Sequence, residues 1–253
     1  MIIEINNLIK TYNKKNVVDI NSFRVDNGDF LGLVGNNGAG KTTLFRMMVD
    51  LVNADGGEIS LSYLNDAGEA VTVNPALSED WKKHTGTYID EGFLIDFLTP
   101  EEYFLFLAKV SNLNEESMQR HIDRCKTFMA GEILGQKKLI RNLSAGNKHK
   151  VGIVAALLSQ PQLLILDEPF NFLDPTSQNV LKDILTEYNR ETNATILLSS
   201  HNLAHTVDIC TRIALLEHGV IINDLKNENG SAATELEQYF THTGSHDVVA
   251  VEE

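Results

Sequence analysis

Apolar runs and helix-like segments alternate over the second half of the chain. Three short apolar runs occupy residues 163–166, 195–198 and 213–216. Runs of this kind are typical of strands that are covered on both faces of a sheet. Between the first two runs, Asp174 and Pro175 provide a helix start signal. The apolar residues that follow recur at helical spacing: Val180, Leu181, Ile184, Leu185 and Tyr188. From residue 151 onwards the pattern therefore predicts parallel β-α units.

The first half of the chain divides into a strand-rich part and a helical part. Strand-like composition occurs at residues 2–5, 16–25 and 59–63, with turn signals at 26–28 and 65–68. Helices are predicted in the middle, where Thr99, Pro100 and Glu102 form a capping box with proline at the first helical position. Further on, apolar side chains recur at helical spacing: Met118, Ile122, Cys125 and Met129.

These patterns predict one α/β domain with an insertion. We expect a core made of residues 1–90 and 151–225, a helical insertion at about 92–150, and an acidic tail at 226–253. The tail loses its periodicity after Phe240 and is predicted to be a short helix followed by a frayed end.

Composition narrows the possible partners. The chain has 253 residues, a formal charge of −14 and a pI near 5.0, which argues against nucleic acid or anionic lipid as a ligand. Its two cysteines, Cys125 and Cys210, lie far apart and are predicted to be small buried residues. We find neither a secretory signal pattern nor an apolar stretch near the ~18–20 residues that span a bilayer. If the protein moves a solute across a membrane, another subunit must provide the path.

The run from Gly35 to Thr42 carries the clearest chemical signal. It fits the pattern G-x-x-x-x-G-K-[ST], in which backbone N–H groups surround the phosphates of a nucleoside triphosphate. A buried strand at 30–34 leads in and a helix opens at 43–48, so the phosphates would lie at a helix N-terminus. The predicted binding residues are Gly35, Asn36, Asn37, Gly38, Ala39, Gly40, Lys41, Thr42 and Thr43. Lys41 would reach the β- and γ-phosphates, and the Thr42 hydroxyl would ligate Mg²⁺. Kinases, GTPases and many ATPases share such a loop, so the loop alone predicts only nucleotide binding.

A pair of carboxylates follows the first of the three apolar runs. Asp167 and Glu168 stand at the end of this strand, and ligands in open α/β sheets bind beyond the carboxyl ends of strands. Asp167 suits a role in holding Mg²⁺, and Glu168 could orient or deprotonate the attacking water. The alternative is an acid pair in a solvated turn, which the phosphate loop upstream makes less favourable.

Several further segments together resemble a known family. Residues 143–147 read Leu-Ser-Ala-Gly-Asn at a helix start, and residues 168–174 run from the second carboxylate to Asp174. His201 follows another strand, and Tyr12 stands in Lys-Thr-Tyr. With the phosphate loop and the acid pair, this order resembles the nucleotide-binding domains of ABC ATPases over nearly the whole chain. The resemblance implies a P-loop NTPase fold with a RecA-like core, an N-terminal antiparallel β subdomain and an inserted α-helical subdomain.

The resemblance also implies cofactors and roles for particular residues. ATP and Mg²⁺ would bind between two subunits in a head-to-tail dimer, held by Lys41 and Thr42 of one and by Ser144 and Gly146 of the other. Tyr12 would stack on adenine, His201 would contact the γ-phosphate, and Asp174 would connect the two sites. Lys41, Glu168 and His201 are the implied catalytic residues.

The sequence departs from the family pattern at three positions. Ala145 replaces a glycine and Asn147 a glutamine in the signature, which predicts a weakened phosphate site rather than an absent one. Glu91 stands where the family has a glutamine that ligates Mg²⁺, so Thr42, Asp167 and Glu91 form the predicted metal set. Some exporters of antibiotics or peptides are similar at this loop, which favours export.

The resemblance predicts a subunit that powers transport by ATP-driven dimer closure. It would lie in the cytoplasm, peripheral on the inner face of the cell membrane, bound to a membrane-spanning permease near Phe93 to Leu98 and to a second ATP-binding subunit. That segment is unusually apolar for a loop, although core packing would also explain its composition. The alternatives are a non-transport ABC ATPase of the iron–sulfur or cell-division type, and a regulatory subunit that hydrolyses ATP weakly. Glu168 and His201 argue against the regulatory alternative, whereas Ala145 and Glu91 leave it open.

Overall fold

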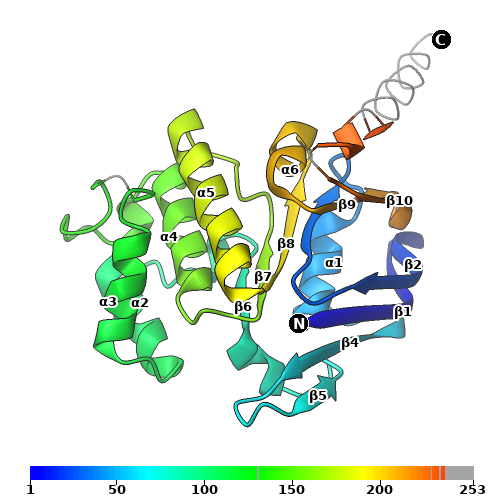
Figure 1. The fold of residues 1–253 in the computed structure, drawn as a ribbon, viewed down its shortest axis with the longest axis horizontal. Coiled ribbons are helices and arrows are strands. Elements are labelled where there is room, and N and C mark those ends of the chain that lie inside the picture. Colours follow the sequence, from blue (N-terminus) through cyan, green and yellow to red (C-terminus); the bar gives the residue numbers. More distant parts are fainter. Residues whose placement is uncertain (130, 229, 234, 237–253) are drawn as a thin grey trace.

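The computed structural model describes residues 1–129, 131–228, 230–233 and 235–236, which form two sheets and the helices around them (Figure 1). The first sheet is antiparallel, has the strand order β2-β1-β4-β5, and consists of β1 (Ile2–Tyr12), β2 (Lys15–Val25), β4 (Gly56–Leu64) and β5 (Ala70–Val73). Its strands alternate buried and exposed positions, because only one face packs on the core.

The second sheet contains the strands that the apolar runs predicted. Its order is β10-β9-β3-β8-β7-β6, and it is parallel except for the antiparallel edge pair β9 and β10. The strands are β3 (Phe30–Val34), β6 (Thr85–Tyr88), β7 (Leu163–Leu166), β8 (Thr195–Ser200), β9 (Arg212–Glu217) and β10 (Val220–Lys226). This mixed sheet beside an antiparallel one confirms the predicted α/β P-loop NTPase fold class.

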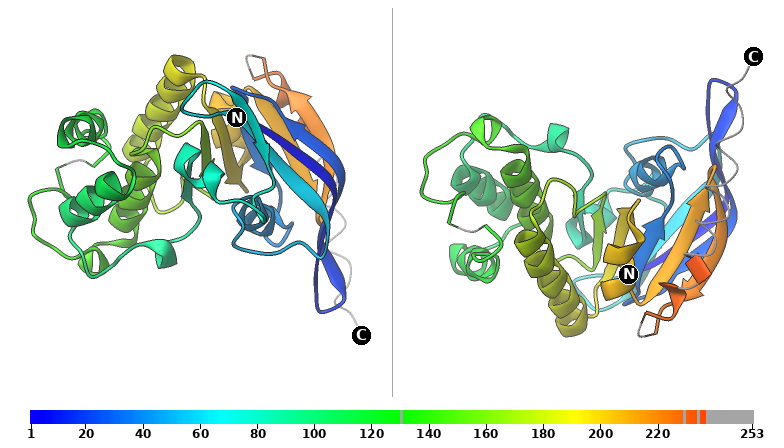
Figure 2. Two further views of the ribbon diagram at one scale, coloured as in Figure 1. Left: turned by 90° about the horizontal axis from the view of Figure 1, so that it is seen from below. Right: turned by 90° about the horizontal axis from the view of Figure 1, so that it is seen from above.

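Helices cover the second sheet on both faces. They are α1 (Lys41–Met48), α2 (Pro100–Val110), α3 (Glu115–Arg124), α4 (Ala145–Leu157), α5 (Pro175–Thr192) and α6 (Leu203–Ile209), with the short 3₁₀ helices η1 (Asp80–His84), η2 (Glu91–Phe93) and η3 (Ile140–Asn142). Figure 2 shows the four-stranded sheet on one side of the molecule, and α2, α3, α4 and α5 on the other. The division into a core, a helical insertion and a tail at the predicted boundaries stays a prediction.

Two apolar clusters hold these layers together, and β3 contributes to both. Phe30 and Val34 belong to the cluster that includes α2, α4 and α5, whereas Leu31 and Leu33 belong to the cluster shared by α1 and the four-stranded sheet. Successive side chains of a strand point to opposite faces. Because one cluster covers each face of β3, all five of its residues are buried. The phosphate loop therefore starts from a strand that is buried along its whole length.

The helix starts follow the sequence signals, but one helix end does not. Thr99 Oγ1 accepts from the Glu102 N–H at 3.3 Å and the Glu102 carboxylate accepts from the Thr99 N–H at 2.8 Å, which confirms the capping box. The helix predicted through Cys125 and Met129 ends at Arg124, and the chain continues in turns. Cys125 and Met129 are both buried, so their spacing reflects core packing rather than a longer helix.

The C-terminal part is described only as far as residue 236. The strand β10 was not predicted, and its alternation of half-buried and exposed positions is typical of an edge strand. The rest of the predicted tail, including Phe240, lies outside the described residues. Both cysteines are buried and free, as predicted.

Candidate functional site

The phosphate loop connects β3 directly to α1 and needs glycine at two positions for steric reasons. A Cβ at Gly35 would lie 2.2 Å from the carbonyl oxygen of Leu216, and a Cβ at Gly40 would lie 2.3 Å from that of Val17. Gly40 also has a φ of 109°, in the region that favours glycine. The loop can therefore lie close to two neighbouring strands only without side chains at these positions.

Lys41 holds its ammonium group inside this loop. The side chain is buried, and Nζ donates to the carbonyl oxygen of Gly35 at 2.6 Å and to that of Asn36 at 3.4 Å. The same Nζ lies 3.4 Å from the Glu168 carboxylate. The loop and the acid at the end of β7 are thus joined by one cation.

Asp167 is buried between α1 and β8. Its carboxylate accepts from Thr42 Oγ1 at 2.5 Å and also from the Ser199 hydroxyl. Burial raises the pKa of Asp167, while the hydrogen bonds from Ser199 and Thr42 lower it. Two oxygen atoms that could ligate a cation, one of a threonine hydroxyl and one of a carboxylate, therefore lie side by side at the start of α1.

Glu168 lies between two cationic or titratable groups. His201 Nδ1 lies 2.9 Å from one carboxylate oxygen, and Lys41 lies near the other. The backbone of Glu168 has a φ of 48° and its N–H donates to Ser199 Oγ at 2.8 Å. A left-handed conformation is uncommon for a residue with a side chain, and such conformations cluster at functional sites. The predicted catalytic residues are thus brought together at one edge of the sheet.

Ser199 is a site residue that the sequence reasoning missed. It is fully buried, and its hydroxyl donates to Asp167 while it accepts from the Glu168 N–H. The available signal was its position two residues before His201 in a buried strand, because the carboxyl ends of neighbouring parallel strands meet at the same sheet edge.

Other predicted residues stand apart from the loop. Ser144 caps α4 by accepting from the Asn147 N–H at 3.2 Å, and Asp174 caps α5 by accepting from the N–H and hydroxyl of Ser177. Tyr12, at the end of β1, is half exposed, and Lys10 Nζ lies 5.4 Å from its ring centroid. In the described part of the chain, no hydrogen bond or ion pair joins these side chains to the phosphate loop. They could therefore reach a nucleotide on this loop only by conformational change, or could serve a loop on another subunit.

Glu91 shares a cavity with both site carboxylates. The cavity holds about 360 Å³, and its lining includes Glu91, Asp167, Glu168 and Ala145. The Glu91 carboxylate lies 3.3 Å from Lys148 Nζ on α4. Among the described residues no group of three or more His, Cys, Asp or Glu side chains is arranged to hold a metal.

Asp90, next to Glu91, is a second acid that the sequence reasoning missed. It lines the same cavity, its side chain accepts from the Gly92 N–H at 2.8 Å, and it lies 3.0 Å from Arg46 Nη2 on α1. The Asp167 N–H donates to the Tyr88 carbonyl at 2.9 Å, so β6 and β7 end together and their acids follow side by side.

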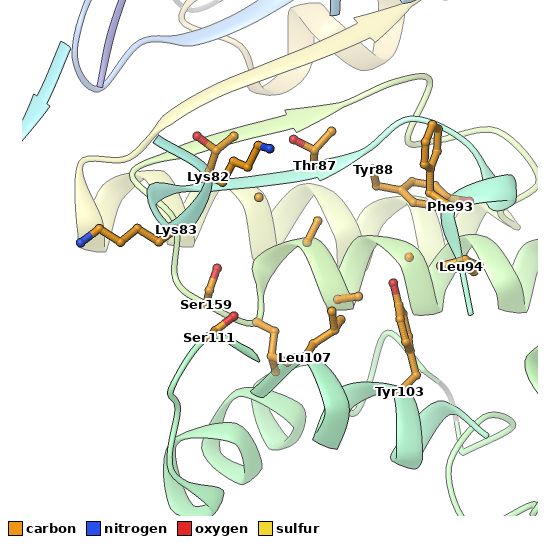
Figure 3. Close-up of a pocket in the computed structure, with 16 residues that line it drawn as sticks. Lys82, Lys83, Thr87, Tyr88, Phe93, Leu94, Tyr103, Leu107, Ser111 and Ser159 are labelled. Atoms are coloured by element: carbon orange, nitrogen blue, oxygen red, sulfur yellow. The ribbon is translucent and has the colours of Figure 1, made fainter. Parts of the chain in front are cut away.

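A second cavity lies between β6, α2 and α4 (Figure 3). It holds about 210 Å³, and Lys82, Thr87, Phe93, Tyr103 and Leu107 are among its lining residues. Its walls combine aromatic and aliphatic side chains with threonine and serine hydroxyls, and the two lysines that line it, at positions 82 and 83, stand toward one end in Figure 3.

The apolar segment that starts at Phe93 borders this second cavity. Leu94 is buried, whereas Phe93 and Phe97 expose 53% and 65% of their surface. Core packing therefore explains part of this segment but not its two phenylalanines. No helix among the described residues has the length and hydropathy needed to cross a membrane.

The sequence matches a known protein-family model over more than half of its length. Residues 18–171 match the model described as ABC transporter. The chain is 30% identical over 244 residues to an uncharacterized ABC transporter ATP-binding protein of Bacillus subtilis, covering 94% of this chain and 74% of that one.

Two relatives have named transport roles. A bacitracin transport ATP-binding protein of Bacillus licheniformis is 31% identical over 228 residues, covering 88% of this chain and 69% of that one. A lipopolysaccharide export system ATP-binding protein of Haemophilus influenzae is 32% identical over 218 residues, covering 85% and 87%.

Solved structures have the same fold. An ATP-binding subunit of an ABC transporter aligns with a TM-score of 0.80 at 28% identity, covering 95% of this chain and all of that one. A dimeric ATP-binding cassette in a post-hydrolysis state, bound to ADP and Pi, aligns with a TM-score of 0.74 at 20% identity, covering 89% and 99%.

Proposed function

The chain belongs to the ABC transporter family of ATP-binding proteins, and from this premise we propose that it binds and hydrolyses ATP to power a membrane transporter. The observation that carries the proposal is the convergence of Lys41, Glu168 and His201 beside the phosphate loop. This arrangement brings a cation, a carboxylate and an imidazole to one sheet edge, and such groups could position water and stabilise charge in phosphoryl transfer. The named transport roles of the relatives support the transport part of the proposal.

ATP would bind along the loop from Gly35 to Thr43. The backbone N–H groups at the start of α1 favour negative charge, because they have no partner within the helix. Lys41 Nζ would exchange its contacts with backbone carbonyls for contacts with the β- and γ-phosphate oxygens. Tyr12 would offer its half-exposed ring to the adenine base.

The residues beside the loop fit a magnesium ion. Thr42 Oγ1 and Asp167 Oδ2 lie 2.5 Å apart, and Mg²⁺ prefers oxygen ligands of these two kinds together with phosphate oxygens and water. Glu91 lines the same cavity as Asp167 and could add a third oxygen if its ion pair with Lys148 opened. The ion would neutralise charge on the phosphates, which is its usual contribution to this chemistry.

Glu168 would orient and deprotonate the water that attacks the γ-phosphate. Its carboxylate follows Asp167 at the end of β7 and faces Lys41 of the loop, so the water would lie between this acid and the γ-phosphate. His201 contacts the same carboxylate through Nδ1, which leaves Nε2 to bind the γ-phosphate. Glu168 has a left-handed backbone, and its carboxylate lies 3.4 Å from Lys41 Nζ of the loop.

A second subunit would complete the site. Ser144 and Gly146 start α4 and would present its N-terminus to the phosphates held by the partner's loop, and Asp174 would connect the two sites. Ala145 has a negative φ at the start of α4, so its methyl group causes no backbone strain. Ala145 and Asn147 would weaken this contact relative to the family pattern without removing it.

The exposed Phe93 and Phe97 would contact a membrane-spanning permease on the inner face of the membrane. Phe93 lines the cavity between β6, α2 and α4, and Phe97 is exposed farther along the same segment, so the two side chains could form an apolar contact surface for the permease. Export of an antibiotic or a peptide is the favoured direction and cargo, because the loop at Glu91 resembles that of such exporters.

The proposal is tested by steady-state ATP hydrolysis of the purified protein. We expect Glu168→Gln to lower kcat by a factor of about 10² to 10⁴, the usual contribution of a general base. Glu187→Gln is the matched control, because Glu187 is an exposed acid on α5 whose partner is Arg190. Equal turnover in the wild type and Glu168→Gln would refute the enzymatic proposal. Failure to recover a multi-spanning subunit with the tagged protein from solubilised membranes would refute the transport part alone.

A further inference from the structure

His149 is a buried side chain to which the proposed mechanism gives no role. It lies on the first turns of α4, and its Nε2 is 3.0 Å from the carbonyl oxygen of Pro169. Its ring meets the ring of Tyr88 edge-on, with centroids 4.9 Å apart, and that of Phe172 at 6.0 Å. The imidazole therefore fills the space between α4, the end of β6 and the loop that follows Glu168.

That loop needs support from outside itself. Glu168 and Phe172 have φ values of 48° and 62°, and left-handed residues persist only where surrounding contacts hold them. Gln178 donates to the carbonyl oxygens of Phe170 and Leu173, which fixes the later part of the loop from α5. The carbonyl of Pro169, immediately after Glu168, is held by His149 from α4.

The hydrogen bond between His149 and Pro169 determines which ring nitrogen of His149 carries a proton. A carbonyl oxygen can only accept a hydrogen bond, so His149 must carry its proton on Nε2. Burial lowers the pKa of His149, so the neutral ring with a proton on Nε2 is the form that fits. A donor directed at the backbone of Pro169, and within reach of that of Glu168, is a specific contact rather than general packing.

The helix α4 also lies close to this loop at its first turn and to Tyr88 at the end of β6. A Cβ at Gly146 would lie 2.6 Å from the Phe172 carbonyl oxygen, and a Cβ at Gly152 would lie 2.0 Å from a ring carbon of Tyr88. A shift of α4 would therefore be transmitted to the loop instead of being absorbed by a gap.

We infer that His149 is a positioning residue, whose Nε2–H bond to Pro169 orients Glu168 and couples that orientation to α4. The inference rests on the proposed function, in which Ser144 and Gly146 at the start of α4 bind the phosphates held by the partner subunit. The contact then makes the acid of one site sensitive to whether α4 has engaged ATP at the other. His149 does not touch substrate and acts only through the backbone next to Glu168.

The test uses the full chain and two substitutions that differ in one donor. His149→Met keeps an apolar side chain of similar size and removes the donor, whereas His149→Gln places an amide N–H near the position of Nε2. We expect kcat for ATP hydrolysis to fall about tenfold in His149→Met, as expected for loss of one hydrogen bond. KM for ATP should stay within about twofold of the wild type, because the phosphate loop is untouched. His149→Gln should restore kcat to within about threefold of the wild type.

His121 provides a matched control on α3. It is buried to a similar extent, and its Nε2 contacts the carbonyl oxygen of Val154 at 3.3 Å. His121→Met should lower the melting temperature while leaving kcat unchanged. In single turnovers on a Glu168→Gln background, His149→Met should have no further effect, since the residue it positions is already lost.

The outcomes separate the two proposals. If the wild type turns over no faster than Glu168→Gln, the proposed function fails and this inference fails with it. If the wild type is active but His149→Met behaves like His121→Met, only the inference is overturned. A full tenfold loss on the Glu168→Gln background, or no rescue by His149→Gln, also overturns the inference.

Discussion

Ser199→Ala removes the hydroxyl that joins the two acids of the site, and its cost can be worked from two contacts. The hydroxyl donates to the buried Asp167 carboxylate and accepts from the Glu168 N–H at 2.8 Å. A hydrogen bond to a charged group contributes about 1.5–3 kcal/mol, and an unsatisfied buried N–H costs about 1–3 kcal/mol. Because the two effects share one atom, we expect a combined loss of about 3 kcal/mol in the free energy of unfolding. For a chain of this length that loss corresponds to a fall of about 6–12 °C in melting temperature.

The assay is urea unfolding, with Ser200→Ala as the matched control. Ser200 is the adjacent buried residue, and among the described residues its hydroxyl bonds only to the backbone of Asn202 in a local turn. Its substitution should cost about 1 kcal/mol. Equal losses in the two variants would refute the conclusion that the Ser199 hydroxyl supports the acid pair.

The same substitution should change the pH dependence of ATP hydrolysis. The hydrogen bond from Ser199 lowers the pKa of Asp167 against the effect of burial. Without that bond the pKa rises further, so the carboxylate that is proposed to bind Mg²⁺ becomes protonated at a higher pH. We expect the acid limb of the activity profile to move to higher pH in Ser199→Ala, and to stay in place in Ser200→Ala.

Two further predictions concern stability. Gly152→Ala would place a Cβ 2.0 Å from a ring carbon of Tyr88. Although alanine is the better helix former, this clash should lower the free energy of unfolding by at least about 1–3 kcal/mol. A higher melting temperature would contradict the close packing of α4 on β6. Burial lowers the pKa of four histidines below the ordinary value of 6.5: His84, His121, His149 and His205. Their contribution to stability is present above pH 6.5 and is lost as the pH falls through their folded pKa values, because the unfolded chain then binds more protons. The melting temperature should therefore drop between pH 7.5 and 5.5, and a constant value would be inconsistent with neutral buried imidazoles.

The sequence alone predicted those parts of the structure that depend on residues close together in the chain. The capping box at Thr99 and the run from Gly35 to Thr42 involve atoms only a few residues apart, so their geometry follows from residue types in order. The strands of the second sheet were predictable because burial on both faces requires continuous apolar runs.

Contacts between distant elements could not be predicted in the same way. The roles of Ser199 and His149 depend on which strand lies beside β7 and which helix crosses its end, and neither residue has a local pattern. The end of α3 at Arg124 was missed because Cys125 and Met129 are buried through turns that happen to keep helical spacing. Asp90 was missed because it and Glu91 are adjacent acids that differ only in their ion-pair partners. Asp90 pairs with Arg46, whereas Glu91 pairs with Lys148.

The position of Lys41 has a consequence for the order of events in catalysis. Its ammonium forms an ion pair with Glu168 and, under the proposed function, is also the group that would bind the triphosphate. Substrate binding would therefore exchange one anion for another around a single cation. The carboxylate would lose this ion pair as the γ-phosphate gains one, while its contact with His201 remains, so the proposed base would accept a proton more readily when ATP is bound.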